Sequence, residues 1–429
     1  MVIEKTLSNG IRVVGEHLPT FRSVAVGVWL KTGSIIETPD QSGISHFIEH
    51  MLFKGTQKRS ARDIAAQMDA IGGQINAFTA KECTCYYVKV IDEHVNIGLD
   101  ILSDMLMNSK FDPDDISKEK GVIVEEIGMS VDNPEDYVHE LINRTHYRGH
   151  PLEHPILGTA ESVNAMDRGK LLGYLHEHYG ADDAVISIAG NFDPERITGQ
   201  IEEYFGTLDF TNNETPTTGV KADAKPGAGN GVSERGSISI AQREIEQVHI
   251  CLGLPGYSMD DAKRYPMLVL NNLFGGSMSS RLFQSIREER GLAYSVYSYP
   301  SAYSDTGMVG VYAGTSPHQV EAVLELTVKE IKTLLQDKIT KDEFEQSREQ
   351  LKGNYILGME GTSSHMTALG KNMTLLGKVV SEEDVIKKID AVTMDDVVET
   401  MTQIFDFGKI SAALVGKVED QERVRSILS

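Results

Sequence analysis

The chain has little cysteine, no long hydrophobic run and no leader-like amino terminus, and each shortage excludes a class of protein. Three cysteines among 429 residues cannot form a disulfide framework, which favours a reducing compartment. The most hydrophobic early run, from Val24 to Leu30, is too short to cross a bilayer. The first residues resemble neither a signal peptide nor a transit peptide. We therefore expect a soluble, cytoplasmic protein that does not bind membranes.

Positive charge is also scarce. Lysine and arginine number 41 against 63 aspartates and glutamates, so the net charge is -22. This charge argues against nucleic acid and anionic membrane surfaces as partners. The hydrophobic share of 40% is typical of a soluble globular protein. A chain of this length predicts two or more domains.

One short stretch, His46-Phe-Ile-Glu-His50, carries the clearest chemical signal. The sequence predicts a helix here, with Ser42 as its N-cap and Gly55 at its end. Apolar residues repeat at helical spacing on one side of it, at Ile44, Phe47, Ile48 and Met51. Two imidazoles one turn apart can bind a single metal ion, and Glu49 lies beside them. Core or surface histidines with no metal would give the same local pattern.

A second helix supplies candidate carboxylates. Asp112-Pro113 predicts its start, and the helical pattern continues from Asp114 to about Met129. Glu119 and Glu126, seven residues apart, fall on a stripe that is otherwise apolar. An unpaired carboxylate buried on that stripe would be costly, and a metal site removes the cost. The alternative is that both glutamates are simply solvated.

The chain also repeats itself on either side of a polar stretch. Residues 211–236 are rich in Thr, Asn and Gly and predict a linker between halves 1–210 and 237–429. The two halves share similar strands, Val24–Leu30 with Val248–Leu254 and Val185–Asp193 with Ser411–Asp420. We therefore expect an α+β fold of two homologous halves in tandem, each a mostly antiparallel sheet flanked by helices.

Only the first half keeps the metal set. In the register of the repeat, the positions of His46, Glu49 and His50 are taken by Met267, Leu270 and Asn271. The remaining histidines make weaker candidates. His150 and His154 lie among prolines, and we expect them on the surface of a loop. One half is therefore predicted to be active and the other to support it.

With these features together, the chain resembles the M16 family of inverzincin metallopeptidases, in the short two-repeat group related to processing peptidases. The resemblance covers essentially the full length, and Glu126 falls at the family's spacing after the second histidine. It implies one Zn²⁺ per chain, bound by His46, His50 and Glu126 with a water in the open position. Glu49 would take the proton of that water, and Glu119 would be an auxiliary carboxylate.

The resemblance implies further site residues. Asn76, Ala77 and Phe78 match the edge strand on which these enzymes align an extended peptide. In the second half, Arg287 and Tyr294 match residues that face substrate near the zinc and help to stabilise the oxyanion.

The implied activity is that of a zinc-dependent endopeptidase acting on peptides or unfolded polypeptide segments. Relatives with two repeats assemble as dimers, so we expect a homodimer, with a heterodimer containing an inactive homologue as the alternative. A catalytically silent scaffold or partner subunit is the competing function.

Overall fold

The computed structural model describes residues 1–208 and 236–428, which fall into two compact units. Unit 1 is built from Met1–Ile127, His154–Gly227 and Gly358–Val380. Unit 2 is built from Gly128–Glu153, Ala228–Leu357 and Ser381–Ser429. All but the last residue of the expected linker, 211–236, lies outside the described residues.

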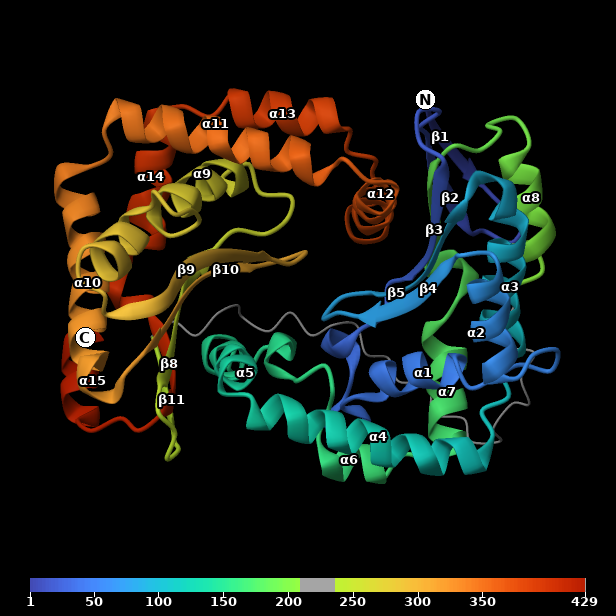
Figure 1. Cartoon of the computed structure of the whole chain (residues 1–429), viewed down its shortest axis with the longest axis horizontal. Coiled ribbons are helices and arrows are strands. Elements are labelled where there is room, and N and C mark those ends of the chain that lie inside the picture. Colours follow the sequence, from blue (N-terminus) through green and yellow to red (C-terminus); the bar gives the residue numbers. More distant parts are fainter. Residues whose placement is uncertain (209–235, 429) are drawn as a thin grey trace. The chain divides into compact units, whose positions relative to one another are not determined.

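Unit 1 is organised around a six-stranded sheet of order β1-β2-β6-β3-β5-β4 (Figure 1). Its strands are β1 (Val2–Thr6), β2 (Arg12–His17), β3 (Ser23–Leu30), β4 (Gln74–Thr79), β5 (Thr84–Ile91) and β6 (Ala184–Gly190). β2 and β6 are parallel, and every other pair of neighbours is antiparallel. β4 therefore lies at one edge of the sheet.

The sequence of β3 explains how both faces of this sheet are used. Successive side chains of a strand point to opposite faces. Val24, Val26, Val28 and Leu30 belong to the main hydrophobic core of the unit. On the opposite face Gly27 lies against Met366, and Trp29 lies against Gly370. The small residues Gly27 and Gly370 let a single helix, α12 (Thr362–Leu376), lie close to the strands.

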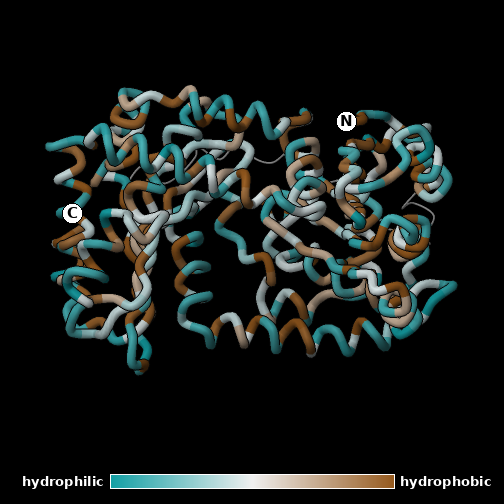
Figure 2. The backbone as a smooth tube through the Cα atoms, turned by 45° about the horizontal axis from the view of Figure 1, so that its top comes forward, coloured by the Kyte–Doolittle hydropathy of each residue, from teal (hydrophilic) through white to brown (hydrophobic). Residues whose placement is uncertain are grey.

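The other face of the sheet carries most of the helices of unit 1. They are α1 (Ile44–Leu52), α2 (Ala61–Ala70), α3 (Val95–Asn108), α6 (Ala160–Asn164), α7 (Arg168–His178) and α8 (Ile197–Phe205). A longer helix, α4 (Pro113–Asp132), begins in unit 1 and ends in unit 2. Figure 2 shows hydrophobic and hydrophilic residues interspersed along α4, as expected for a helix with one covered side.

Unit 2 repeats this plan with a five-stranded sheet of order β7-β11-β8-β10-β9. Its strands are β7 (Ile238–Gln242), β8 (Val248–Gly256), β9 (Ala293–Ala302), β10 (Gly307–Thr315) and β11 (Ser411–Gly416). β7 and β11 are parallel, and the other neighbours are antiparallel. The even-numbered residues of β8 from Val248 to Leu254 enter the core, as they do in β3.

The helices of unit 2 are distributed in the same way. One helix, α5 (Pro134–His146), packs against β8 and β11 on one face of the sheet. The remaining helical elements are α9 (Arg264–Phe274), the π-helical segment η7 (Phe283–Glu288), α10 (Val320–Asp337), α11 (Lys341–Gly358), α13 (Glu382–Asp390), α14 (Met394–Ile404) and α15 (Gln421–Leu428). α9 packs against β9, and α14 packs against β8.

The strand order confirms the predicted fold of two homologous α+β halves. Counting from β2 and from β7, both units run through the sheet in the same order, with one parallel and three antiparallel pairs. Matched glycines end the central strands, Gly190 with φ 134° and Gly416 with φ 135°. At both positions a Cβ atom would collide with a backbone carbonyl oxygen, so each position requires glycine.

Two helices cross between the halves of the sequence. α12 follows the linker in sequence yet covers the sheet of unit 1, and α5 precedes the linker yet covers the sheet of unit 2 (Figure 1). The boundaries predicted at the linker therefore separate the strands of the two sheets, but not these two helices. No helix among the described residues is long and apolar enough to cross a membrane.

Candidate metal centre

Helix α1 has the two faces that the sequence predicts. Its apolar stripe, made of Ile44, Phe47, Ile48 and Met51, is at most 1% exposed and belongs to the core of unit 1. On the other side His46 is buried, and Glu49 and His50 are partly buried. Gly55 follows the helix with φ 113°, a conformation that favours glycine. The predicted helix and its end are confirmed.

The predicted N-cap is wrong. Gly43, not Ser42, precedes the first turn, with φ 88°. Glycine has no side chain that could cap the helix. The buried Glu37 takes that role from the preceding loop. Its carboxylate accepts the Gly43 N–H at 2.7 Å and the Ser45 N–H at 3.0 Å. Two otherwise unpaired amides at the start of α1 are satisfied in this way, which fixes the helix in place.

Helix α4 brings the two predicted carboxylates to α1, but to different depths. Glu119 is 4% exposed and lies between the buried Ile116 and Ile123. The side chain of Glu126 is 44% exposed. Glu119 therefore belongs to the interior of the unit, whereas Glu126 lies at its surface, where a bound ion can be reached.

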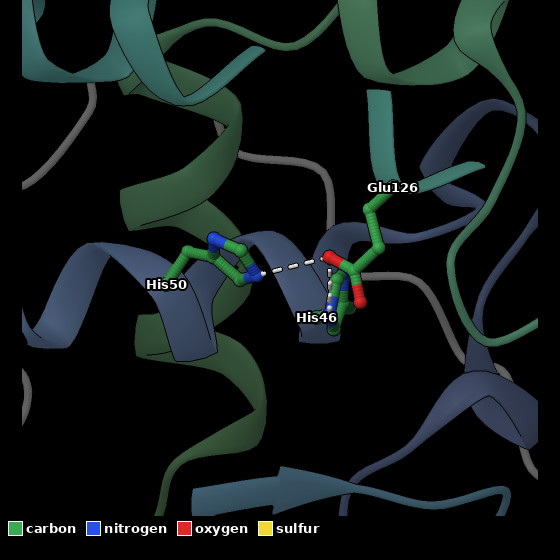
Figure 3. Close-up of side chains that lie close together, drawn as sticks. All are labelled: His46, His50 and Glu126. Carbon is green, nitrogen blue, oxygen red and sulfur yellow. Dashed lines mark ion pairs between the residues drawn. The ribbon is translucent and has the colours of Figure 1, made fainter. Parts of the chain in front are cut away.

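Three side chains converge as a metal site requires (Figure 3). Glu126 Oε2 lies 3.7 Å from His46 Nε2 and 3.5 Å from His50 Nε2. Ligand atoms bound to one tetrahedral zinc ion lie about 3.3–3.6 Å apart. Two nitrogens and one carboxylate oxygen are also ligands that zinc accepts. The residues present therefore fit a zinc ion.

The protonation of His46 suits a metal as well. Burial lowers the pKa of His46 to about 4, and the neighbouring His50 contributes to the shift. His46 is therefore neutral at neutral pH, with a lone pair available for coordination. Its Nδ1 atom is buried and has no hydrogen-bond partner among the described residues.

His50 differs from His46 because its second nitrogen is held. Nδ1 of His50 lies 3.0 Å from Glu119 Oε2. A carboxylate can only accept, so Nδ1 carries the hydrogen and Nε2 keeps its lone pair toward Glu126. The other carboxylate oxygen of Glu119 lies 2.6 Å from Lys54 Nζ.

Glu49 is attached to the edge of the sheet. The Thr79 hydroxyl, at the end of β4, donates to Glu49 Oε2 at 2.6 Å. Burial raises the pKa of Glu49, and the bond from Thr79 partly opposes that shift. The carboxylate is thus fixed next to the three candidate ligands, with a raised affinity for a proton.

The predicted peptide-binding residues lie on β4, which is an edge strand as expected. Ala80 N–H donates to Cys83 O, so the alternation of the ladder turns the backbone of Ala77 toward the open edge. There the Ala77 N–H is occupied by the Oδ1 atom of Asn76 at 2.9 Å. Phe78 packs edge-on against Trp29 at 5.6 Å between ring centroids.

Arg287 and Tyr294 belong to unit 2, where they lie together. The Arg287 guanidinium carbon is 4.6 Å from the centroid of the Phe283 ring and 5.2 Å from that of Tyr294. Tyr294 is 82% exposed, near the start of the edge strand β9. The stack holds Arg287 in place and presents the tyrosine ring to solvent.

Sequence reasoning missed three features. Glu37 and Lys54 show no pattern of their own, because their partners are distant in the sequence or depend on how the chain turns. His150 was expected on a loop surface, and that prediction is wrong, since it is 5% exposed. Its Nδ1 accepts the Leu152 N–H, and its Nε2 lies 3.4 Å from Asp305.

Comparison with known families matches most of the chain. The model described as Insulinase (Peptidase family M16) matches residues 12–160, and that described as Peptidase M16 inactive domain matches residues 165–351. The first range contains every candidate metal ligand, and the second contains Arg287 and Tyr294.

Similar proteins extend over nearly the whole length. The chain is 46% identical to the uncharacterized zinc protease YmxG of Bacillus subtilis, over 94% of this chain and 96% of that protein. It is 40% identical to the uncharacterized zinc protease SCO5738 of Streptomyces coelicolor, over 98% of this chain and 90% of that protein. The crystal structure of a protease from Helicobacter pylori has the same fold, with a TM-score of 0.88, 20% identity, and 97% and 99% of the two chains covered.

Proposed function

Because the chain belongs to peptidase family M16, we propose that it is a zinc-dependent endopeptidase that hydrolyses peptides or unfolded polypeptide segments. The observation that carries the proposal is the convergence of His46, His50 and Glu126 beside a carboxylate, Glu49, that is tied to an edge strand. Structural histidines would not need this combination.

His46, His50 and Glu126 would hold one zinc ion. When bound, zinc supplies Lewis-acid polarisation of a carbonyl group and lowers the pKa of a coordinated water toward about 7. The side chains around the ion orient its ligands and keep them in the protonation state that binds metal. Glu119 fixes the orientation of His50, and the burial of His46 keeps its imidazole neutral.

Glu49 is the proposed proton carrier. Its carboxylate takes a proton from the attacking water and delivers it to the amine nitrogen that leaves. Burial raises the pKa of Glu49 toward the working range of a general base and acid. The hydrogen bond from Thr79 keeps the Oε2 atom of the carboxylate in place.

The edge strand β4 is the proposed binding surface for the peptide backbone. An extended substrate can pair with the open edge through Ala77, with Asn76 and Phe78 beside it. The Asn76 side chain now covers the Ala77 N–H, so it must turn aside when a substrate strand binds. Main-chain pairing of this kind places few demands on substrate sequence.

Unit 2 is proposed to supply Arg287 and Tyr294 to the substrate. Their stacking supports that role, because the exposed Tyr294 ring is held without being covered. We also propose that the chain acts as a homodimer in the cytoplasm. Measuring the mass of the assembly in solution tests the dimer, and a monomer that cleaves peptides at full rate would contradict it.

The test of the activity is Glu49→Gln. This variant should bind zinc as the wild type does and lose cleavage of a peptide library by about 10²–10⁴-fold. Matched controls are wild type treated with a chelator, then restored with zinc. Undiminished cleavage by Glu49→Gln would overturn the proposed mechanism.

A catalytically silent subunit is the second candidate, favoured by the match of residues 165–351 to a domain described as inactive. It predicts stoichiometric zinc together with no cleavage of any peptide in the library. Cleavage by the purified wild type that a chelator abolishes rules it out.

A further inference from the structure

We propose that Lys54 is a positioning residue for the metal centre: it holds Glu119, and through Glu119 it orients His50 for zinc. The inference rests on the proposed zinc site and adds a residue one contact further out. Lys54, Glu119 and His50 form a continuous chain of contacts, with Nζ–Oε1 at 2.6 Å and Oε2–Nδ1 at 3.0 Å.

The turn that follows α1 places Lys54 next to Glu119. The Lys54 N–H donates to Met51 O at 3.1 Å, which continues the last turn of the helix. Gly55 then reverses the chain with φ 113°, and its carbonyl accepts the Lys110 N–H. The backbone of Lys54 is therefore fixed at the end of the helix that carries both histidines, and its side chain reaches α4.

Glu119 needs this partner because it is buried. A carboxylate that is 4% exposed is costly unless both oxygens have partners and its charge is opposed. His50 occupies one oxygen, and Lys54 occupies the other. With both oxygens engaged, the carboxylate has one orientation, and that orientation fixes the plane of the His50 ring.

Lys54 and Glu119 affect the orientation of His50 rather than that of His46. Nδ1 of His46 has no hydrogen-bond partner among the described residues, so no side chain there fixes the ring of His46 as Glu119 fixes that of His50. Glu119 therefore orients His50 and not His46, and losing Lys54 should loosen the His50 ring alone.

A lysine near a metal site also repels the metal ion, and the two effects must be compared. The Lys54 side chain is 34% exposed, and the negative Glu119 lies between it and His50. Solvent and that carboxylate screen its charge. The alignment of Glu119 acts at contact distance and is not screened, so we expect alignment to outweigh repulsion.

The experiment compares zinc affinity of the full-length variants by competition with a chelator of known affinity. Lys54→Met should bind zinc about 10-fold more weakly than wild type, the lower end of the effect of losing an outer partner of a metal ligand. Lys54→Arg, which keeps the charge, should stay close to wild type. Lys58→Met, at an exposed lysine four residues further along, is the matched control and should not change affinity.

A double variant separates positioning from general damage. If Lys54 acts through Glu119, then Lys54→Met/Glu119→Gln should bind zinc no more weakly than Glu119→Gln alone. Lys54→Leu, which also lacks a hydrogen-bond donor, replaces Lys54→Met if the latter does not fold. Additive losses would overturn the proposal, as would wild-type affinity in a folded Lys54→Met or Lys54→Leu.

The proposed activity fails separately from this inference. Absence of zinc binding in the wild type would overturn both the peptidase and the role of Lys54. Wild-type zinc binding and cleavage, with an unaltered Lys54→Met, would overturn only the role of Lys54.

Discussion

Units 1 and 2 share a strand order, but different chemical groups link the equivalent pair of helices in each unit. In unit 1, α1 and α4 are linked by ionisable groups: His50 with Glu119, and both histidines with Glu126. In unit 2, the helices in the same order are α9 and α11. There neutral groups make the link, since the Asn272 amide donates to Ser347 O at 3.0 Å and to Gln350 Oε1 at 3.1 Å.

The difference shows what the fold needs and what the site adds. Met267 and Leu270, at the positions of His46 and Glu49, are at most 2% exposed and belong to the core of unit 2. The helix pair is therefore stable with apolar residues at these positions. The fold of such a unit does not require ionisable groups at the positions of His46 and Glu49, so we expect those of unit 1 to serve chemistry.

The largest expected effect comes from giving α1 the residues of α9. The triple variant His46→Met, Glu49→Leu and His50→Asn removes two metal ligands and the proton carrier together. We expect zinc binding to be lost and peptide cleavage to fall by at least about 10⁴-fold. Thermal unfolding of the variant should remain cooperative, at a temperature below that of the wild type, because the buried Glu119 loses its His50 partner. A folded triple variant that still cleaves peptides would refute the division of roles.

The second prediction compares one buried histidine from each unit. His146 on α5 is fully buried, neither ring nitrogen has a partner among the described residues, and burial lowers its pKa to about 4. A lowered pKa means that the unfolded chain takes up the proton first. The contribution of His146 to stability is therefore complete above pH 6.5 and is lost as the pH falls toward about 4.

His146→Leu tests this difference directly. Between pH 6.5 and about 4, the wild-type unfolding free energy should fall by about 3 kcal/mol more than that of the variant. His46 has a similarly lowered pKa, but bound zinc would occupy its lone pair. Denaturant unfolding at several pH values, with and without zinc, provides the measurement. Parallel pH profiles for wild type and His146→Leu would contradict the prediction.

A third prediction concerns the helices that cross between halves. A Cβ atom at Gly370 of α12 would lie 1.9 Å from Trp29 Nε1, and Trp29 is fully buried. Gly370→Ala should therefore destabilise unit 1 by about 1–3 kcal/mol through overpacking. Gly353 on α11 has open space around it, so Gly353→Ala should stabilise by about 0.5–1 kcal/mol. Urea unfolding of both variants measures the contrast, and equal effects would contradict it.

The smallest effect is expected at the edge strand. Ala77→Pro removes the N–H that is turned toward the open edge of β4, while Ala77→Ser keeps it. Losing one backbone hydrogen bond to substrate should lower kcat/KM by about 5–10-fold, mainly through a higher KM. Zinc content should not change. If Ala77→Pro has wild-type kinetics, the peptide does not pair at this position.

Much of the fold could be predicted because its signals are local. The similar stretches Val24–Leu30 and Val248–Leu254 identified β3 and β8, and Val185–Asp193 and Ser411–Asp420 identified β6 and β11. The metal ligands could also be predicted from the sequence, since two lie on one helix and Glu126 shares a stripe with Glu119. The structure brings all three together.

The rest depended on distant partners. Glu37 replaces Ser42 at the start of α1 because a loop folds back onto the helix, which local propensity does not reveal. For a similar reason, the sequence did not reveal that α5 covers the sheet of unit 2 and α12 the sheet of unit 1. A helix with one apolar side has the same pattern whichever sheet it covers.

The crossing of α12 has a consequence for synthesis of the chain on the ribosome. The sheet of unit 1 has all its strands once Gly190 has been made, yet the helix that covers Trp29 begins only at Thr362. At about 5–20 residues per second, this gap lasts roughly 10–40 s. During that time one apolar face of the sheet lacks its native cover, so we expect nascent chains to need a chaperone there.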